Sequence, residues 1–145
     1  SSDLSLAPAT VLVTENLETL LELPDQAGAV AIHGAGFAVE ALALVPWVAQ
    51  ARILYWGDLD SHGFAILHRA RAVGLEFESV LMDRATLEEH RDLWVAEPSP
   101  ASGEYPLLTP AEQDALSALR AHGNVRLEQE RIPWGYATSV LHDRW

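Results

Sequence analysis

The sequence predicts an α/β fold in which a parallel central sheet of about four strands is flanked by helices. Two observations predict it. Short apolar runs alternate with helix-like segments through the first two-thirds of the chain, and the run at residues 53–56 has no polar alternation. A strand of that kind is typical of a parallel sheet with both faces covered. Strands that alternate with helices favour parallel pairing through right-handed crossovers.

Each expected strand is an apolar or β-branched run that ends at polar residues or glycine. The helices are predicted from caps and stops: Asn16 suits an N-cap, Pro24 a stop, and Thr109 with Pro110 an N-cap and first helical residue. Thr86 is the expected cap of the helix that follows the fourth strand. The expected strands are residues 10–14, 28–33, 53–56 and 77–82. The expected helices are residues 16–23, about 37–44, about 63–73, 86 toward 94, one from 110, and a short last one that Pro133 opens.

At 145 residues the chain is about one domain long. We expect a single domain over residues 1–145, with an α/β core at 1–95. Residues 96–145 would form a loop rich in Pro, Ser and Gly and a small C-terminal helical appendage. The chain opens on Ser1 without a methionine, which suggests the C-terminal fragment of a longer protein.

Composition excludes several classes of protein. No apolar run approaches the roughly 18 residues that span a bilayer, and no segment resembles a secretion signal. Cysteine is absent, which excludes disulfides and thiolate metal sites. We therefore expect a cytoplasmic protein with no membrane contact.

The formal net charge of −12 opposes unaided binding to nucleic acid, whose affinity depends on Lys and Arg at the phosphates. Lysine is absent, so arginine supplies every basic side chain except histidine. An acidic domain can still act on a polyanion if metal ions bridge its carboxylates to phosphate and another domain supplies the basic surface.

Three carboxylates follow the first and third expected strands. Asp58 and Asp60 stand one residue apart after residues 53–56, and Glu15 follows residues 10–14. In open α/β sheets, ligands bind beyond the carboxyl ends of the strands, where the strand order reverses. If strands one and three are neighbours there, the three acids converge and repel one another unless a cation is present. Magnesium, held by a few carboxylates and substrate phosphate, fits such a cluster.

Each acid also has a structural interpretation. Asp58 and Asp60 can cap the next helix through its free N–H groups, and Glu15 can be a solvated residue at a helix start. His62 can contact phosphate or relay a proton, or be a polar residue near a helix start. His33 and the turn Gly34-Ala35-Gly36 end the second strand at the same edge, where the glycines can serve substrate approach or the turn itself.

These motifs resemble the Toprim metal site of topoisomerases, bacterial primases and related nucleases, in which a Glu follows the first strand and Asp-x-Asp-x-x-Gly, here ending at Gly63, follows the third. More specifically, the chain resembles the C-terminal domain of the JetD family, nuclease subunits of Wadjet plasmid-defence systems that are similar to the A subunit of topoisomerase VI. The blocks that carry this resemblance are Tyr55-Trp56-Gly57-Asp58-Leu59-Asp60-Ser61-His62-Gly63-Phe64, Leu81-Met82-Asp83-Arg84-Ala85-Thr86-Leu87 and Arg126-Leu127-Glu128-Gln129-Glu130-Arg131-Ile132.

The resemblance implies a Toprim-like Rossmannoid fold and a Mg²⁺-dependent cut in closed-circular plasmid DNA, made with an SMC-type partner complex; Mn²⁺ can substitute. It implies that Asp58 and Asp60 hold the metal and that Glu15 holds it too or acts as general base. His62, Gly63, Glu128 and Glu130 are accessory candidates, although the two glutamates can instead pair with Arg126 or Arg131. DNA would be gripped by an N-terminal region absent from this sequence. A metal-bound water is the expected nucleophile, and a homodimer is expected.

Two other functions remain open. A degenerate Toprim fold can serve as a docking or dimerisation module that keeps its acids for stability. Asp58-Leu59-Asp60 after a strand also resembles the nucleophile loop of haloacid-dehalogenase-type phosphatases. Those enzymes usually require a lysine beside the phosphate, and this chain has none.

Overall fold

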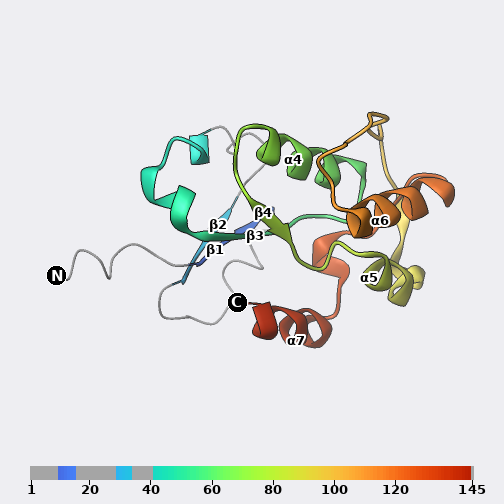
Figure 1. Cartoon of the computed structure of the whole chain (residues 1–145). Helices are drawn as coiled ribbons and strands as arrows, with labels where there is room; N and C mark the ends of the chain where they lie inside the picture. Colours follow the sequence, from blue (N-terminus) through green and yellow to red (C-terminus); the bar gives the residue numbers. More distant parts are fainter. Residues whose placement is uncertain (1–9, 16–28, 34–40, 145) are drawn as a thin grey trace.

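The structure, a computed structural model, describes residues 10–15, 29–33 and 41–144 (Figure 1). The helix predicted at 16–23, the turn at 34–36 and most of the helical segment predicted at 37–44 lie outside these residues. The described strands and helices confirm an α/β fold with a parallel sheet flanked by helices.

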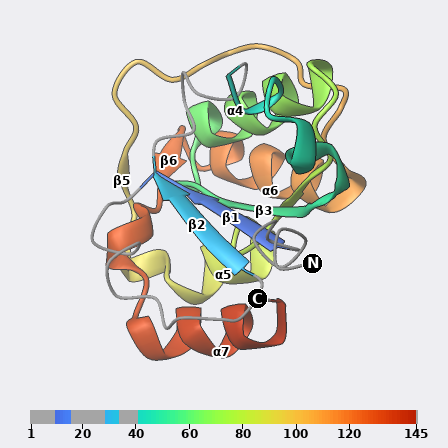
Figure 2. The ribbon, with the colours of Figure 1, turned by 90° about the vertical axis from the view of Figure 1, so that its left-hand side faces the viewer.

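The sheet contains four parallel strands in the order β2-β1-β3-β4. The order reverses at β1, because β2 pairs with one of its edges and β3 with the other. Figures 1 and 2 show α4 on one side of the sheet and α7 on the other. The strands are β1 (Thr10–Thr14), β2 (Ala29–His33), β3 (Arg52–Trp56) and β4 (Phe77–Ser79).

Strands β1 and β3 are buried on both faces, as their continuous apolar sequences predict. Residues 11–13 and 53–56 are each at most 2% exposed. A 3-10 helix, η1 (Pro46–Gln50), precedes β3. Burial of the central strands on both faces leaves their carboxyl ends as the place where polar side chains can gather.

Aspartates cap the two helices that follow β3 and β4, and in the second of them the aspartate stands in place of the expected threonine. Helix α4 (Ser61–Ala72) has Asp60 as its N-cap. Helix α5 (Arg84–Glu89) has Asp83, whose carboxylate accepts the N–H of Thr86 at 2.7 Å, so the predicted Thr86 cap is wrong. Ionised carboxylates suit this position because they accept hydrogen bonds from the free N–H groups and interact favourably with the positive end of the helix dipole. Helix α5 ends before the predicted limit, and a 3-10 turn, η2 (Arg91–Leu93), follows it.

The fourth strand is shorter than predicted, because the chain leaves the sheet at Leu81. Val80 still donates its N–H to Tyr55 O at 2.9 Å, but Leu81 has φ 60°. A bulky residue in the left-handed region is uncommon and turns the chain sharply. Ala96, predicted to lie in a loop, belongs to a short strand, β5 (Val95–Ala96), which pairs antiparallel with β6 (Val125–Arg126).

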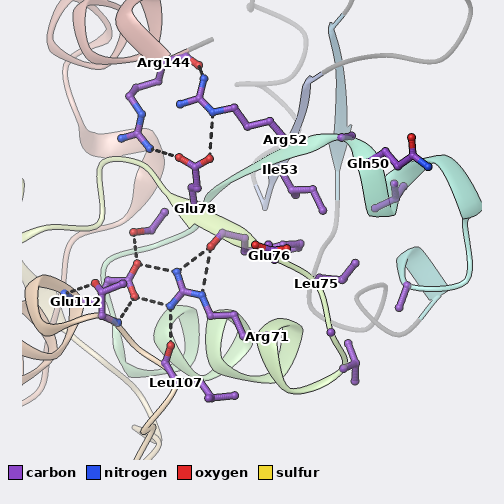
Figure 3. A pocket seen from close by; sticks show the side chains of 18 residues that line it. Gln50, Arg52, Ile53, Arg71, Leu75, Glu76, Glu78, Leu107, Glu112 and Arg144 are labelled. Atoms are coloured by element: carbon purple, nitrogen blue, oxygen red, sulfur yellow. Dashed lines mark hydrogen bonds and ion pairs between the residues drawn. The ribbon is translucent and has the colours of Figure 1, made fainter. Parts of the chain in front are cut away.

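Helix α6 (Pro110–Ala121) begins as predicted, with Thr109 as N-cap and Pro110 as its first residue. Glu112 completes a capping box: its side chain accepts the Thr109 N–H at 2.8 Å, and its own N–H binds the Thr109 hydroxyl. The same carboxylate accepts hydrogen bonds from Arg71 at 2.6 and 3.0 Å and from Ser79 at 2.6 Å. Figure 3 shows this network in a pocket beside β4 and the start of β3, at the opposite end of β3 from Asp58.

We expect Glu112→Gln to lower the free energy of unfolding by about 3–5 kcal/mol, the usual effect of removing one partner of a buried ion pair. Burial opposes ionisation of Glu112, but the hydrogen bonds from Arg71, Ser79 and Thr109 outweigh it and hold its pKa below the ordinary value. This contribution is present above the ordinary pKa and is lost as pH falls through the lowered one. Urea unfolding at pH 7 measures the loss, and a Glu112→Gln variant as stable as wild type would contradict it.

The matched control for Glu112→Gln is Glu88→Gln. Glu88 forms an exposed i,i+4 pair with Arg84 at 3.0 Å. Such pairs contribute only about 0.3–0.5 kcal/mol. The two variants remove the same charge and differ in burial.

The C-terminal residues pack into the same core as the sheet. Leu116, Leu119, Leu127 and Leu141 all belong to the buried cluster that contains β1 and β3. A 3-10 turn, η3 (Gln129–Arg131), precedes α7 (Trp134–Arg144). Among the described residues, no helix has both the length and the apolar character needed to cross a membrane.

Candidate functional site

The candidate site lies where β1 and β3 end side by side. Thr14 and Trp56, the last residues of these strands, are partners in the parallel register, so Glu15 and Gly57 leave the sheet next to each other. The predicted proximity of strands one and three is therefore confirmed, and their ends lie where the strand order reverses. His33 ends β2 opposite Thr14 at the same edge, as expected.

Tyr55, next to last in β3, is a buried residue on which the charges of the three predicted acids act. Its side chain is fully buried, and its hydroxyl donates to Glu15 Oε2 at 3.4 Å. Burial raises the Tyr55 pKa well above its ordinary value, and the charges of Glu15, Asp60 and Asp58 raise it further. The hydroxyl therefore stays protonated and can hold the Glu15 carboxylate. Sequence reasoning missed this role because Tyr55 reads as one more member of an apolar strand.

Gly57 is required beside this hydroxyl. A Cβ at Gly57 would lie 2.4 Å from Tyr55 Oη, which is too close for two non-bonded atoms. Because Tyr55 is fully buried, its ring has no room to move away. The glycine between β3 and Asp58 therefore serves the packing of the tyrosine.

Asp58 is a partly buried carboxylate whose ionised form a bound cation would stabilise. Its Oδ1 accepts the backbone N–H of Gln129 at 2.7 Å. Burial raises the Asp58 pKa to about 6, and the neighbouring charges of Asp60 and Glu130 act in the same direction against the Gln129 hydrogen bond and Arg126. At neutral pH the group is mostly ionised at a cost that a bound cation would offset.

Asp60 is more deeply buried than Asp58, and both of its oxygens are engaged. Oδ1 accepts the N–H of Gly63 at 2.7 Å, which confirms the helix-capping interpretation for this residue. Oδ2 accepts Arg126 Nε at 2.7 Å. Burial raises the Asp60 pKa, and repulsion from Glu97 adds to it, outweighing Gly63 and Arg126.

Gly63 allows α4 to start against the acidic loop. A Cβ there would lie 2.2 Å from the backbone oxygen of Asp58. The glycine of the Asp-x-Asp-x-x-Gly motif is therefore a close-approach residue that brings its N–H to Asp60.

Glu97 is a site residue that sequence reasoning missed. It follows β5 and is 5% exposed, and its carboxylate accepts the Ser61 N–H at 3.1 Å, the Ser61 hydroxyl at 2.8 Å and the His62 N–H at 3.3 Å. The free N–H groups of α4 are thus occupied by the protein's own carboxylates, Asp60 and Glu97. Only the pairing of β5 with β6 brings Glu97 there, and its sequence, inside a Pro-rich stretch, carries no signal.

The His62 side chain is half-exposed. Its Nε2 lies 2.8 Å from Ser99 O and 3.9 Å from Glu97 Oε2. The residue stands in the first turn of α4, so the interpretation as a polar residue near a helix start holds. These contacts direct the imidazole toward the loop after β5.

The block at residues 126–132 folds back onto the acidic loop. Leu127 and Leu59 exchange two backbone hydrogen bonds of 3.0 Å, and the buried amide Nε2 of Gln129 donates to Thr14 Oγ1 at the end of β1. Gln129 thereby links β1 to Asp58. Its membership of the resemblance block was the only sequence signal for this role.

The two glutamates of that block lie beside the core of the site. Glu130 is exposed, and its charge reaches Asp58. Glu128 is half-buried and lies 3.9 Å from Arg131, so the predicted pairing within the block holds loosely for this residue. Arg126, the other expected partner, pairs with Asp60 instead.

The donor set suits magnesium in its chemistry, because carboxylate oxygens are the protein ligands that this ion prefers. Over the described ranges, no three acidic or histidine side chains are placed to close around one ion. Magnesium is commonly held by one or two carboxylates, several waters and substrate phosphate, which fits this arrangement. Asp58, with one oxygen hydrogen-bonded to Gln129 and a raised pKa, is the best-placed ligand.

Comparison with known proteins gives one family match. The family described as Wadjet protein JetD, C-terminal, matches residues 1–141. No curated protein matches the chain.

Proposed function

The chain belongs to the family of Wadjet JetD C-terminal domains, and from that membership we propose that it is a Toprim-type, metal-dependent endonuclease domain that cuts closed-circular plasmid DNA. Family membership makes the chain part of a component of a multi-subunit Wadjet defence complex. The observation that supports the nuclease proposal is that Glu15, which accepts the Tyr55 hydroxyl at 3.4 Å, and the loop that carries Asp58 and Asp60 follow paired strands at the point where the strand order reverses.

In the proposed reaction, Asp58 and Asp60 would hold Mg²⁺, and Glu15 would either bind it or accept a proton from the attacking water. The bound ion would supply a Lewis acid for the scissile phosphate and lower the pKa of water. Tyr55 orients Glu15 through its hydroxyl, and the Gln129 N–H fixes one oxygen of Asp58. The second oxygen of Asp58 would be the one to bind the ion.

The charge of the chain determines what its partners must supply. With a net charge of −12, the domain repels DNA, so we propose that a basic surface on another region or subunit grips the duplex. An SMC-type assembly would deliver the plasmid. We also propose a homodimer, on the resemblance to the A subunit of topoisomerase VI; Trp134 in α7, 37% exposed, is a candidate contact residue.

A docking module without catalysis is the second candidate function. The observation that favours it is Asp60, both of whose oxygens have structural partners, Gly63 and Arg126. In that case the acids would cap α4 and hold β6 in place without binding metal.

The test is cleavage of closed-circular plasmid by the complete Wadjet complex in Mg²⁺, with wild-type protein and with Asp58→Asn. We expect wild type to cut the plasmid and Asp58→Asn to leave it closed, because the principal metal ligand is lost. Asp92→Asn is the matched control, since Asp92 is exposed in η2 and should not affect cutting. Cleavage by Asp58→Asn at the wild-type rate would remove the nuclease proposal and favour the docking module.

A further inference from the structure

Arg126 stands inside the acidic site. Its Nε contacts Asp60 Oδ2 at 2.7 Å, and Asp58 and Glu97 are close enough for their charges to act on it. Within the part of the chain that the structure describes, no other arginine, lysine or histidine has an ion pair with Asp58 or Asp60. Among the described residues, Arg126 is therefore the positively charged side chain that pairs with this acidic loop.

The backbone of Arg126 is held on both sides. Arg126 pairs with Val95 across the β5–β6 ladder, and the next residue, Leu127, exchanges two hydrogen bonds with Leu59. The side chain is 23% exposed, whereas that of Asp60 is 3% exposed. The long side chain can therefore turn toward solvent by rotamer changes, without any rearrangement of β6.

We propose that Arg126 is an internal counter-ion which competes with a divalent cation for Asp60, and so sets the metal affinity of the site. The Asp60 oxygen that Arg126 contacts is the one left over from capping α4, since Gly63 holds the other. A dication bound to that oxygen would repel the guanidinium whose Nε lies 2.7 Å from the same oxygen, so the metal and Arg126 each weaken the other's hold on Asp60. This inference rests on the proposed metal-dependent function and adds the residue that opposes metal entry.

The competition has a reciprocal consequence. If metal must displace Arg126, removing Arg126 strengthens metal binding. The same change leaves Asp60 buried without its counter-ion, which destabilises the metal-free fold. Metal should therefore stabilise an Arg126 variant more than it stabilises wild type, because binding then replaces a missing charge.

The experiment is calorimetric titration of Mn²⁺ into the 145-residue chain and its variants, with thermal unfolding measured with and without Mn²⁺. We expect Arg126→Gln to bind Mn²⁺ about tenfold more tightly than wild type, within the usual range of coupling between sites. Its Tm should be lower without metal and should rise more on Mn²⁺ addition. Arg131→Gln is the matched control, because Arg131 is exposed and pairs only loosely with Glu128, at 3.9 Å. The Mn²⁺ affinity of Arg131→Gln should therefore equal that of wild type.

Equal Mn²⁺ affinities of wild type and Arg126→Gln would overturn the inference while leaving the metal site intact, provided that Asp58→Asn abolishes binding. Absence of binding in wild type and Arg126→Gln alike would overturn both the metal site and this inference. If Arg126→Gln does not fold without metal, circular dichroism measures whether added Mn²⁺ refolds the variant. Refolding by Mn²⁺ supports the competition, and a variant that stays unfolded overturns it.

Discussion

Asp58→Asn is expected to abolish Mn²⁺ binding and, at the same time, to stabilise the metal-free protein. The metal loses its best-placed ligand because an amide oxygen carries no negative charge. The fold gains because wild-type Asp58 must be ionised in a partly buried site beside Asp60 and Glu130. Asparagine keeps an oxygen that can accept the Gln129 N–H, so the local geometry should survive.

The gain in stability depends on pH. The pKa of Asp58 is about 6 in the folded protein and 3.8 ordinarily, so the folded state binds its proton more tightly. The stability that this proton contributes is fully present below pH 3.8, and it is lost as the pH rises through about 6. The loss amounts to roughly 2–3 kcal/mol at pH 7, since one pKa unit corresponds to about 1.4 kcal/mol.

Two measurements check the Asp58→Asn prediction. Calorimetry should show Mn²⁺ binding to wild type that weakens below pH 6 and is absent in the variant. Urea unfolding at pH 7 should show the variant to be more stable than wild type, with the difference shrinking toward pH 4. A folded variant that binds Mn²⁺ as wild type does would exclude Asp58 as a ligand. Asp92→Asn, at an exposed position, controls for the loss of one charge.

Gly63→Ala is expected to lower the free energy of unfolding by roughly 3 kcal/mol or more, toward the severe end of overpacking substitutions. The new Cβ would lie 2.2 Å from the Asp58 backbone oxygen and 3.2 Å from Met82 Cε. Since the first contact is with backbone, relief requires α4 or the acidic loop to move. Such a shift would stretch the hydrogen bond from Gly63 to Asp60 and disturb the metal site as well.

Gly135→Ala is the matched control for Gly63→Ala. Gly135 lies in α7, and a Cβ there meets nothing within 4 Å. Alanine should therefore stabilise that helix by up to about 1 kcal/mol. Urea unfolding of both variants gives the comparison. A Gly63→Ala variant as stable as wild type would show that the close approach of α4 to the loop does not exist.

The sheet and its acidic edge were predictable because their signals are local. An apolar run such as residues 53–56 can be covered on both faces only in a central strand, and Thr109 with Pro110 starts a helix by chemistry contained in those residues. That β1 and β3 end side by side followed from one further rule, the reversal of strand order at the site. The errors lay at element ends, where Asp83 replaced Thr86 as cap and Leu81 ended β4 early, and in the short strands β5 and β6, which were not predicted.

The sequence by itself determined the four strands of the parallel sheet, most helix starts and the acids that follow β1 and β3, because these depend on residues close together in the chain. The tertiary structure alone decided the partners of those acids. Arg126 and Gln129 reach Asp60 and Asp58 from 66 and 71 residues away, and Glu97 reaches Ser61 from 36 residues away. Contacts at such separations depend on how β5, β6 and the turn after β6 pack against the acidic loop, and no local pattern specifies that packing.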